Sequence, residues 1–246
     1  MKEEVYAKKT KKEKLYESFS FFIILLTVFL GGLKVYNQHL QTVKGITIVS
    51  DSEIEEVIKV VEEQPLVVID AGHGGIDPGS DNQGFLEKDI NLQISLKLQQ
   101  ALLDKGYRVL MTRSDDTALE LTERSDFANE VEADLFISIH QNCYLQDSSV
   151  SGIEVYYNDD KITNDEAFAQ SIQQSLVAST GARDRGIREE ASLVVTRETK
   201  MPAVLIETAF ISSDRELSLI TSDDYQTQVV EGIVMGIENF LNDLNN

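Results

Sequence analysis

The chain has 246 residues and an acidic composition, with 22 Lys and Arg against 42 Asp and Glu and a formal net charge of −20. Residues 37–246 carry the imbalance, with 15 basic and 38 acidic side chains, which disfavours nucleic acids and anionic lipids as partners. The single cysteine, Cys143, excludes an intramolecular disulfide, so a folded domain must be stabilised by its core. The roughly 180 residues from Pro65 onward suffice for one such domain.

The N-terminal residues have the pattern of a membrane-targeting segment. Residues 1–18 form a basic tail, and residues 19–36 are almost wholly apolar, with Lys34 able to reach the membrane interface. Bulky residues follow the apolar run where signal cleavage would need small ones. This favours an uncleaved transmembrane signal anchor over a form secreted after cleavage. The basic flank predicts a cytoplasmic N-terminus, one span and an extracytoplasmic domain.

Residues 37–64 are interpreted as a stalk or linker between the anchor and the domain. Ser52 and Glu55 form a possible capping box, and apolar residues then follow helical spacing between acids. This segment is either a short amphipathic helix lying on the domain or a spacer. Residues 65–246 are the candidate catalytic domain.

From Pro65 on, short apolar runs alternate with amphipathic stretches. Strands that alternate with helices predict a layered α/β fold. We expect strands at 67–70, 107–112, 135–139, 152–157, 194–195 and 203–206, and helices at 90–102, 121–131, 167–177 and 225–241.

Polar residues follow three of the predicted strands. His73 follows the first strand, His140 the strand at 135–139, and Glu207 the strand at 203–206. The carboxyl ends of neighbouring strands line one crevice in an α/β sheet, so these side chains can converge. Two imidazoles and a carboxylate suit a catalytic zinc ion, and a further carboxylate can carry protons. Glu87 is a second candidate acid.

Each of these residues also has an ordinary structural role. A histidine can be a hydrogen-bonded residue of the core, and Glu87 can be an acid favoured by the dipole of the helix that it begins. The separations of 73, 87 and 140 match no short metal motif such as HExxH. On the residues alone, a metal hydrolase and a structural role therefore remain balanced.

The chain resembles the zinc-dependent N-acetylmuramoyl-L-alanine amidases of the Amidase_3 family over nearly all of residues 66–243. Several motifs that occur in the same order as in the family, each at a predicted strand or helix, identify the family more specifically than any single motif does. The matching segments are DAGHGGIDPGS (70–80), EKDINL (87–92), MTRSDD (111–116), LTERSDFAN (121–129), SIHQN (138–142), RGIR (185–188) and PAVLIETAFISS (202–213).

This resemblance implies a site and a reaction. It implies His73, Glu87 and His140 as ligands of one Zn²⁺ ion and Glu207 as the catalytic acid/base. The implied reaction cleaves the amide between the lactyl group of N-acetylmuramic acid and L-alanine in peptidoglycan. The implied fold has three αβα layers, with helices flanking a mostly parallel, mixed sheet.

Other residues carry weaker signals. Asn142, Arg185 and Arg188 are candidate substrate contacts, although the two arginines lie in what reads as a polar loop, where solvated charge is common. Asp77 either supports a metal ligand or is a turn residue before Pro78, and the turn is favoured. We expect Arg124 to pair with acids of its own helix.

Two features depart from the pattern of the family. Cys143 stands where a small residue is frequent, and a small buried side chain is favoured over an extra metal ligand. Little sequence separates the strand around Glu154 from the helix around Phe168, where some family members carry an inhibitory helix. We therefore expect a site that does not strictly require an activator protein.

Alternative functions remain open. One is an inactive wall-binding module on an amidase fold, and another is a zinc-dependent deacetylase or peptidase acting on a different wall bond. The biological setting is equally open between sporulation, cell separation and wall turnover.

Overall fold

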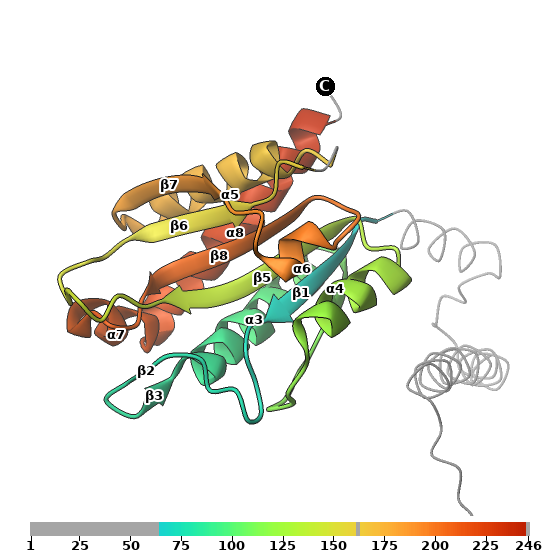
Figure 1. Ribbon diagram of the computed structural model, residues 1–246. Helices are drawn as coiled ribbons and strands as arrows, with labels where there is room; N and C mark the ends of the chain where they lie inside the picture. Colours follow the sequence, from blue (N-terminus) through green and yellow to red (C-terminus); the bar gives the residue numbers. More distant parts are fainter. Residues whose placement is uncertain (1–63, 161–162, 245–246) are drawn as a thin grey trace, which may run out of the picture. The chain divides into compact units, whose positions relative to one another are not determined.

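The computed structural model describes residues 64–160 and 163–244. These residues form a sheet of six strands with helices on both faces, as Figure 1 shows. In chain order the elements are β1 (Leu66–Ala71), β2 (Asp81–Asn82), β3 (Phe85–Leu86), α3 (Glu87–Asp104), β4 (Arg108–Met111), α4 (Leu121–Glu130), β5 (Leu135–Asn142), β6 (Ile153–Tyr157), α5 (Asp165–Thr180), β7 (Asp184–Glu189), α6 (Val194–Arg197), β8 (Ala203–Phe210), α7 (Asp214–Ile220) and α8 (Asp223–Leu244).

The sheet has the strand order β4-β1-β5-β8-β6-β7. β4, β1, β5 and β8 run parallel, whereas β6 runs antiparallel to β8 and β7 runs parallel to β6. The carboxyl ends of β1, β5 and β8 therefore meet at one edge, beside the amino end of β6. β2 and β3 form a separate short hairpin.

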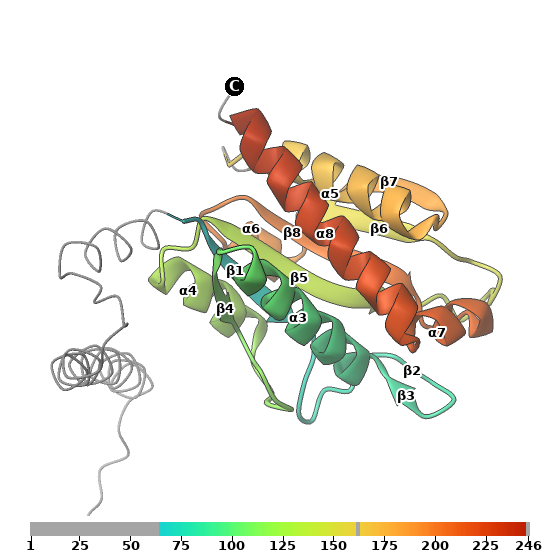
Figure 2. The ribbon, with the colours of Figure 1, turned by 180° about the vertical axis from the view of Figure 1, so that it is seen from behind.

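Helices α3, α5 and α8 cover one face of the sheet (Figure 2). Strand residues such as Val67, Ile69 and Ile137 point toward these helices and form the larger core. α8 approaches α5 closely at Gly236, where an added Cβ atom would lie 2.8 Å from the Cα atom of Ile172. A larger residue at this contact would force the two helices apart.

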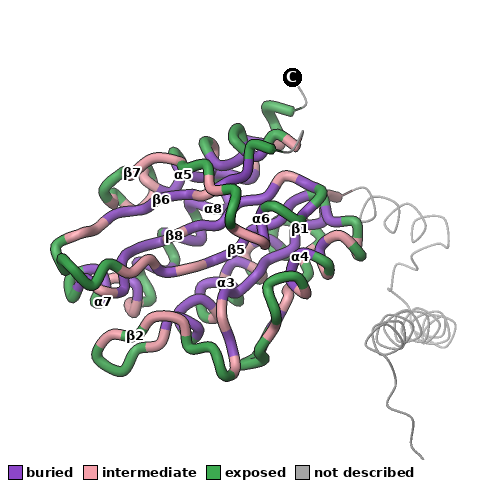
Figure 3. Tube along the Cα trace, in the orientation of Figure 1, coloured by how far each residue is buried: buried purple, intermediate pink, exposed green. Residues whose placement is uncertain are grey.

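Helices α4 and α6 cover the opposite face, and a smaller core that includes Val68, Phe136 and Leu205 lies beneath them. They lie toward the end of the sheet where β1 and β8 begin (Figure 1). β1 is buried at every residue, as is typical of a parallel strand covered on both faces. The central strands are mostly buried, whereas exposure concentrates in the connecting loops (Figure 3). The predicted three-layer, mostly parallel α/β fold is confirmed.

Several elements differ from the sequence-based expectation, among them the short hairpin of β2 and β3, which was not expected. Residues 194–195 begin the short helix α6 instead of a strand, and residues 184–189 form strand β7 instead of a polar loop. α7 was not expected at all. The predicted tail, anchor and stalk lie outside the described residues. Within the part of the chain that the structure describes, no helix combines the length and hydropathy needed to cross a bilayer.

Candidate metal centre

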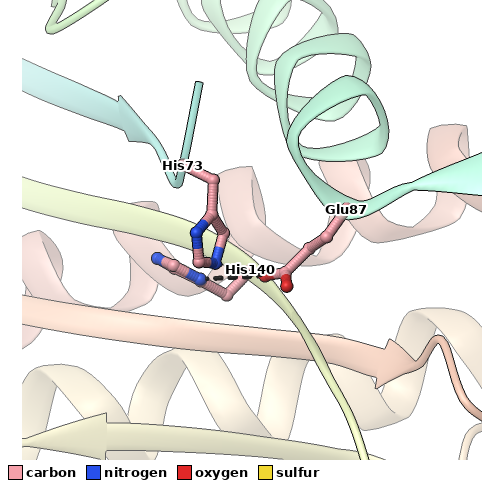
Figure 4. A group of neighbouring side chains, drawn as sticks. All are labelled: His73, Glu87 and His140. Atoms are coloured by element: carbon pink, nitrogen blue, oxygen red, sulfur yellow. Dashed lines mark hydrogen bonds and ion pairs between the residues drawn. The ribbon is translucent and has the colours of Figure 1, made fainter. Parts of the chain in front are cut away.

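Three potential metal ligands meet at the carboxyl edge of the sheet. His73 follows β1, His140 lies near the end of β5, and Glu87 is the first residue of α3. One donor atom from each residue lies within 4.8 Å of the others, and the three side chains point toward one another in Figure 4. The structure therefore brings together the three residues that the family resemblance implied as ligands, and in the described residues no other such group occurs.

The carboxylate of Glu87 lies between the two imidazoles. Its Oε1 atom is 3.0 Å from Nδ1 of His140 and 3.2 Å from Nε2 of His73. The backbone N–H groups of Gln141 and Ser80 donate to its two oxygens at 3.1 and 2.9 Å. Burial would raise the pKa of Glu87, but the hydrogen bonds and charges of His140 and His73 outweigh burial and lower it. Glu87 is therefore an ionised carboxylate whose orientation is fixed by these hydrogen bonds.

This donor set fits a zinc ion. Two imidazoles and one carboxylate are typical of catalytic zinc sites, which keep a further position for water or substrate. The outer nitrogen of His73, Nδ1, lies 2.8 Å from Oδ2 of Asp77, and such a contact fixes the tautomer and orientation of a metal-binding histidine. Asp77 also accepts a hydrogen bond from the backbone N–H of Gly79, so it both stabilises the turn and contacts the candidate ligand His73.

Two arginines hold the backbone of the loop that carries His73. Arg113 donates to the carbonyl oxygens of Ala71 at 2.8 Å and Gly72 at 2.9 Å. Arg124 donates to those of Ala71 at 2.9 Å and His73 at 2.8 Å. Three consecutive carbonyls thus accept guanidinium hydrogen bonds. They fix the backbone at His73, whose φ of 61° lies in the left-handed region.

Arg124 also forms a buried ion pair with Asp70 of β1. Nη1 of Arg124 lies 2.8 Å from Oδ1 of Asp70, and the two side chains are 3% and 0% exposed. The hydroxyls of Thr112 and Ser138 donate to the same carboxylate. Burial would raise the pKa of Asp70, but the charge of Arg124 and these hydrogen bonds lower it. The expectation that Arg124 pairs with acids of its own helix is wrong, because its guanidinium points into the sheet.

The ring of His140 lies directly against Gly72. A Cβ atom at Gly72 would lie 2.3 Å from Nε2 of His140, so only glycine leaves room for the ring in this position. The motif GHG therefore contains one candidate ligand, His73, and its first glycine leaves space for the other imidazole, His140.

Glu207 lies on β8 beside the triad. It pairs in register with His140 of β5 and with Glu154 of β6. Its Oε2 atom is buried without a hydrogen-bond partner among the described residues. Burial raises the pKa of Glu207 well above its usual value, and the charges of Glu87 and Glu154 raise it further. A carboxyl group with a raised pKa is suited to proton transfer near neutral pH.

The three candidate substrate contacts converge on the buried carboxylate of Glu154. Nδ2 of Asn142 donates to its Oε1 at 2.6 Å, and Nε of Arg188 donates to its Oε2 at 2.5 Å. Nε of Arg185 lies 3.3 Å from the same Oε2. The two arginines thus belong to an ordered strand, β7, and to one cluster.

Cys143 follows β5 and packs against the larger core. Its backbone N–H donates to Oδ1 of Asn142 at 2.8 Å. It is not a member of the metal group found in the described residues. The interpretation of Cys143 as a small, partly buried side chain therefore agrees with the structure.

Arg113 and Glu154 are residues of the site that the sequence did not predict. Arg113 lies in the quoted segment MTRSDD, directly after a predicted strand, which is a position where sites form. Glu154 is the one charged residue in the strand Ile153–Tyr157. A charge in an otherwise apolar strand was the signal that could have identified it.

Comparisons with known proteins agree with this geometry. The model of the family Amidase_3, described as N-acetylmuramoyl-L-alanine amidase, matches residues 67–239. The chain is 40% identical over 179 residues to the uncharacterized protein YqiI of Bacillus subtilis, covering 72% of this chain and 85% of that protein. It is 37% identical to the amidase LytC of the same organism, covering 71% of this chain but 35% of LytC. A crystal structure of an N-acetylmuramoyl-L-alanine amidase from Clostridium difficile 630 aligns with a TM-score of 0.70 and 38% identity, covering 73% and 97% of the two chains.

The chain therefore belongs to the Amidase_3 family of N-acetylmuramoyl-L-alanine amidases. It is a peptidoglycan amidase with a His/Glu/His group that is consistent with the metal site of such enzymes. Since peptidoglycan lies outside the cytoplasmic membrane, the domain acts outside the cytoplasm.

Proposed function

We propose that His73, Glu87 and His140 bind one zinc ion per domain and that Glu207 is the catalytic acid/base of amide hydrolysis. The observation that carries the proposal is the convergence of two imidazoles and one carboxylate at the sheet edge, in a chain of this family. The register of β8, which sets Glu207 opposite His140, supports the assignment of the fourth residue.

The proposed reaction is hydrolysis of the amide between the lactyl group and L-alanine. Bound zinc supplies a Lewis acid that acidifies water and polarises the amide carbonyl. Glu207 takes a proton from the attacking water and delivers it to the alanine nitrogen, because an amine leaves only when protonated. Its Oε2 atom is buried without a hydrogen-bond partner among the described residues and is available for the proton.

Metal content and product analysis test this proposal. We expect one zinc ion per chain, loss of activity in chelator and recovery with added zinc. Glu207→Gln should keep zinc and lose activity by about 10²- to 10⁴-fold, whereas Glu189→Gln, a change of an exposed strand residue, should leave both intact. Mass spectrometry should show stem peptides with a free L-alanine amine. Wild-type turnover by Glu207→Gln would exclude this residue as the acid/base, and other products would indicate a deacetylase or peptidase.

Asn142, Arg185 and Arg188 are proposed to contact the substrate. Their support is the pocket that they share beside Glu207, lined by Asn142, Arg185 and Arg188 together with Glu154. Their replacement should change the Michaelis constant more than the turnover number, because they lie beside the metal group and outside it.

The proposed chain organisation is a cytoplasmic tail at 1–18, a transmembrane signal anchor at 19–36, a stalk at 37–64 and the catalytic domain at 65–246. The pattern of basic and apolar residues supports it. Fractionation of cells and protease treatment of protoplasts test the single span and the outer position of the domain. Release of full activity into the medium with a shortened N-terminus would instead indicate cleavage and secretion.

The domain is proposed to work without a strictly required activator. The connection between β6 and α5 spans only residues 158–164, which supports a site without an inserted inhibitory helix. The purified protein alone should hydrolyse peptidoglycan, and complete dependence on an added protein would contradict this. Whether the activity serves sporulation, cell separation or wall turnover is tested by deleting the gene and following each process.

A further inference from the structure

A basic pocket adjoins the catalytic edge of this acidic domain. It has a volume of about 560 Å³, and its lining includes Arg183, Arg185 and Arg188 from the region of β7 and the buried Glu154 from β6. Asp147 is the other carboxylate in the lining, so the pocket has a net charge of +1. Residues 37–246 as a whole carry −23. Positive charge is thus concentrated here against the overall charge of the domain, as expected of a site that takes an anion.

The guanidinium groups of Arg185 and Arg188 both face the buried carboxylate of Glu154 through their Nε atoms. Arg188 donates to Glu154 through Nε, and Arg185 faces the same oxygen through its own Nε. The guanidinium of Arg185 also lies 4.8 Å from the ring centre of Phe210. Among the described residues, no side chain or backbone group accepts a hydrogen bond from the terminal nitrogens of either arginine. These nitrogens are free to bind a planar anion in bidentate fashion.

The pocket begins one strand away from the reacting bond. Glu154 pairs with Glu207 across β6 and β8, and directly paired residues have Cβ atoms about 4.5–5.5 Å apart. An anionic group in the pocket therefore lies within a residue or two of the scissile amide. The lactyl carboxyl is itself the carbonyl of that amide, so nearby negative charge on the substrate must come from the peptide.

We propose that Arg185 and Arg188 bind the α-carboxylate of the second stem-peptide residue. Glu154 positions the two arginines, and the amide of Asn142 orients Glu154 from the side of β5. This inference rests on the proposed amidase function and adds a substrate determinant to it. The site would distinguish a stem peptide with a free carboxylate from one in which the same group is amidated.

Two probes that differ only in this group test the inference. They are N-acetylmuramoyl-L-alanyl-D-glutamate, with a free α-carboxylate, and N-acetylmuramoyl-L-alanyl-D-isoglutamine, in which it is amidated. We expect the full chain to show a specificity constant about 10- to 100-fold higher for the acid, as a charged hydrogen-bonded contact provides. Arg188→Gln should reduce this ratio toward one through the Michaelis constant. Arg197→Gln, a matched change on α6, should leave the ratio unchanged.

The experiment distinguishes failure of the carboxylate-binding proposal from failure of the amidase proposal. Because each probe also competes with peptidoglycan, inhibition constants give the same comparison where turnover of small fragments is slow. Equal constants for the two probes, with peptidoglycan still cleaved at the lactyl amide, would overturn the pocket assignment and leave the amidase proposal standing. Failure to cleave peptidoglycan at that amide would overturn the amidase proposal itself. A charge preference that survives in Arg188→Gln and in Arg185→Gln would place the carboxylate elsewhere.

Discussion

Replacing Arg124 by alanine should weaken the fold and the metal site together. The side chain is 3% exposed, and its partner Asp70 is fully buried. The substitution leaves the charge of Asp70 without a counter-ion and removes the guanidinium donor from the carbonyl of His73. Breaking a buried ion pair by removing one partner costs about 3–5 kcal/mol. For a domain of this size, that loss corresponds to a fall in melting temperature of about 6–20 °C.

The free energy of unfolding and the zinc affinity should both decrease in Arg124→Ala. Urea unfolding gives the change in free energy, and competition with a chromophoric chelator gives the zinc affinity, which should fall by about 10- to 100-fold, as when a ligand loses its supporting contacts. Arg124→Lys should be intermediate, because an ammonium keeps the charge but does not reproduce the planar array of donors. Arg197→Ala, on the exposed side of α6, is the matched control and should change neither quantity.

A double-mutant cycle isolates the ion pair from other effects. Asp70→Asn combined with Arg124→Ala should cost less than the sum of the two single changes, since the double variant leaves no unpaired buried charge. If Arg124→Ala unfolds within about 0.5 kcal/mol of the wild type and binds zinc equally well, the assignment of Arg124 as a positioning residue is refuted.

Three further outcomes follow from the site. In metal-free protein, Glu207→Gln should raise the melting temperature at pH 7. The pKa of Glu207 is higher in the folded than in the unfolded protein, so ionisation of this carboxyl group destabilises the native state. The gain should vanish below about pH 4, where the group is protonated in both states. Gly72→Ala should abolish zinc binding in a protein that still folds, as judged by circular dichroism and metal analysis, because the added Cβ atom occupies the position of the His140 ring. Asp77→Asn should weaken zinc binding by about 10- to 100-fold with little change in unfolding free energy, since its partner is the outer nitrogen of His73 at an exposed position; an unchanged zinc affinity would show that this contact has no orienting role.

The sequence predicts the alternation of strands and helices because the central strands are buried and apolar. It fails where an element lacks that signal. β7 is a polar strand at the edge of the sheet, so no apolar run or alternation distinguishes Asp184–Glu189 from a loop. Val194 and Val195 are β-branched, which favours a strand locally, yet they begin a four-residue helix from which Val195 packs into the smaller core. Tertiary packing overrides propensity in such short elements.

The candidate site likewise contains residues that the sequence predicts and contacts that it does not predict. The rule that strand ends meet at one edge anticipated that His73 and His140 lie together, and the family resemblance added Glu87. The contacts of Arg113 and Arg124 with the loop that carries His73 could not be anticipated, because the acceptors are backbone carbonyls, which every residue possesses and which leave no trace in a sequence. The grouping of Arg185 with Glu154 required the pairing of β6 with β7, which sequence reasoning did not provide.

The strand direction changes between β8 and β6, and the two sides of this change differ in how freely their residues can be substituted. His73, His140 and Glu207 lie on or directly after the parallel strands β1, β5 and β8, and Glu87 begins α3. These elements also form the core, so substitutions near the candidate metal ligands disturb the interior. β7 pairs only with β6 and has one open edge. Substitutions on this edge strand can therefore accumulate with little effect on the interior. Under the proposed role of Arg185 and Arg188, a change on β7 can alter which stem peptides are bound while the hydrolytic residues stay the same.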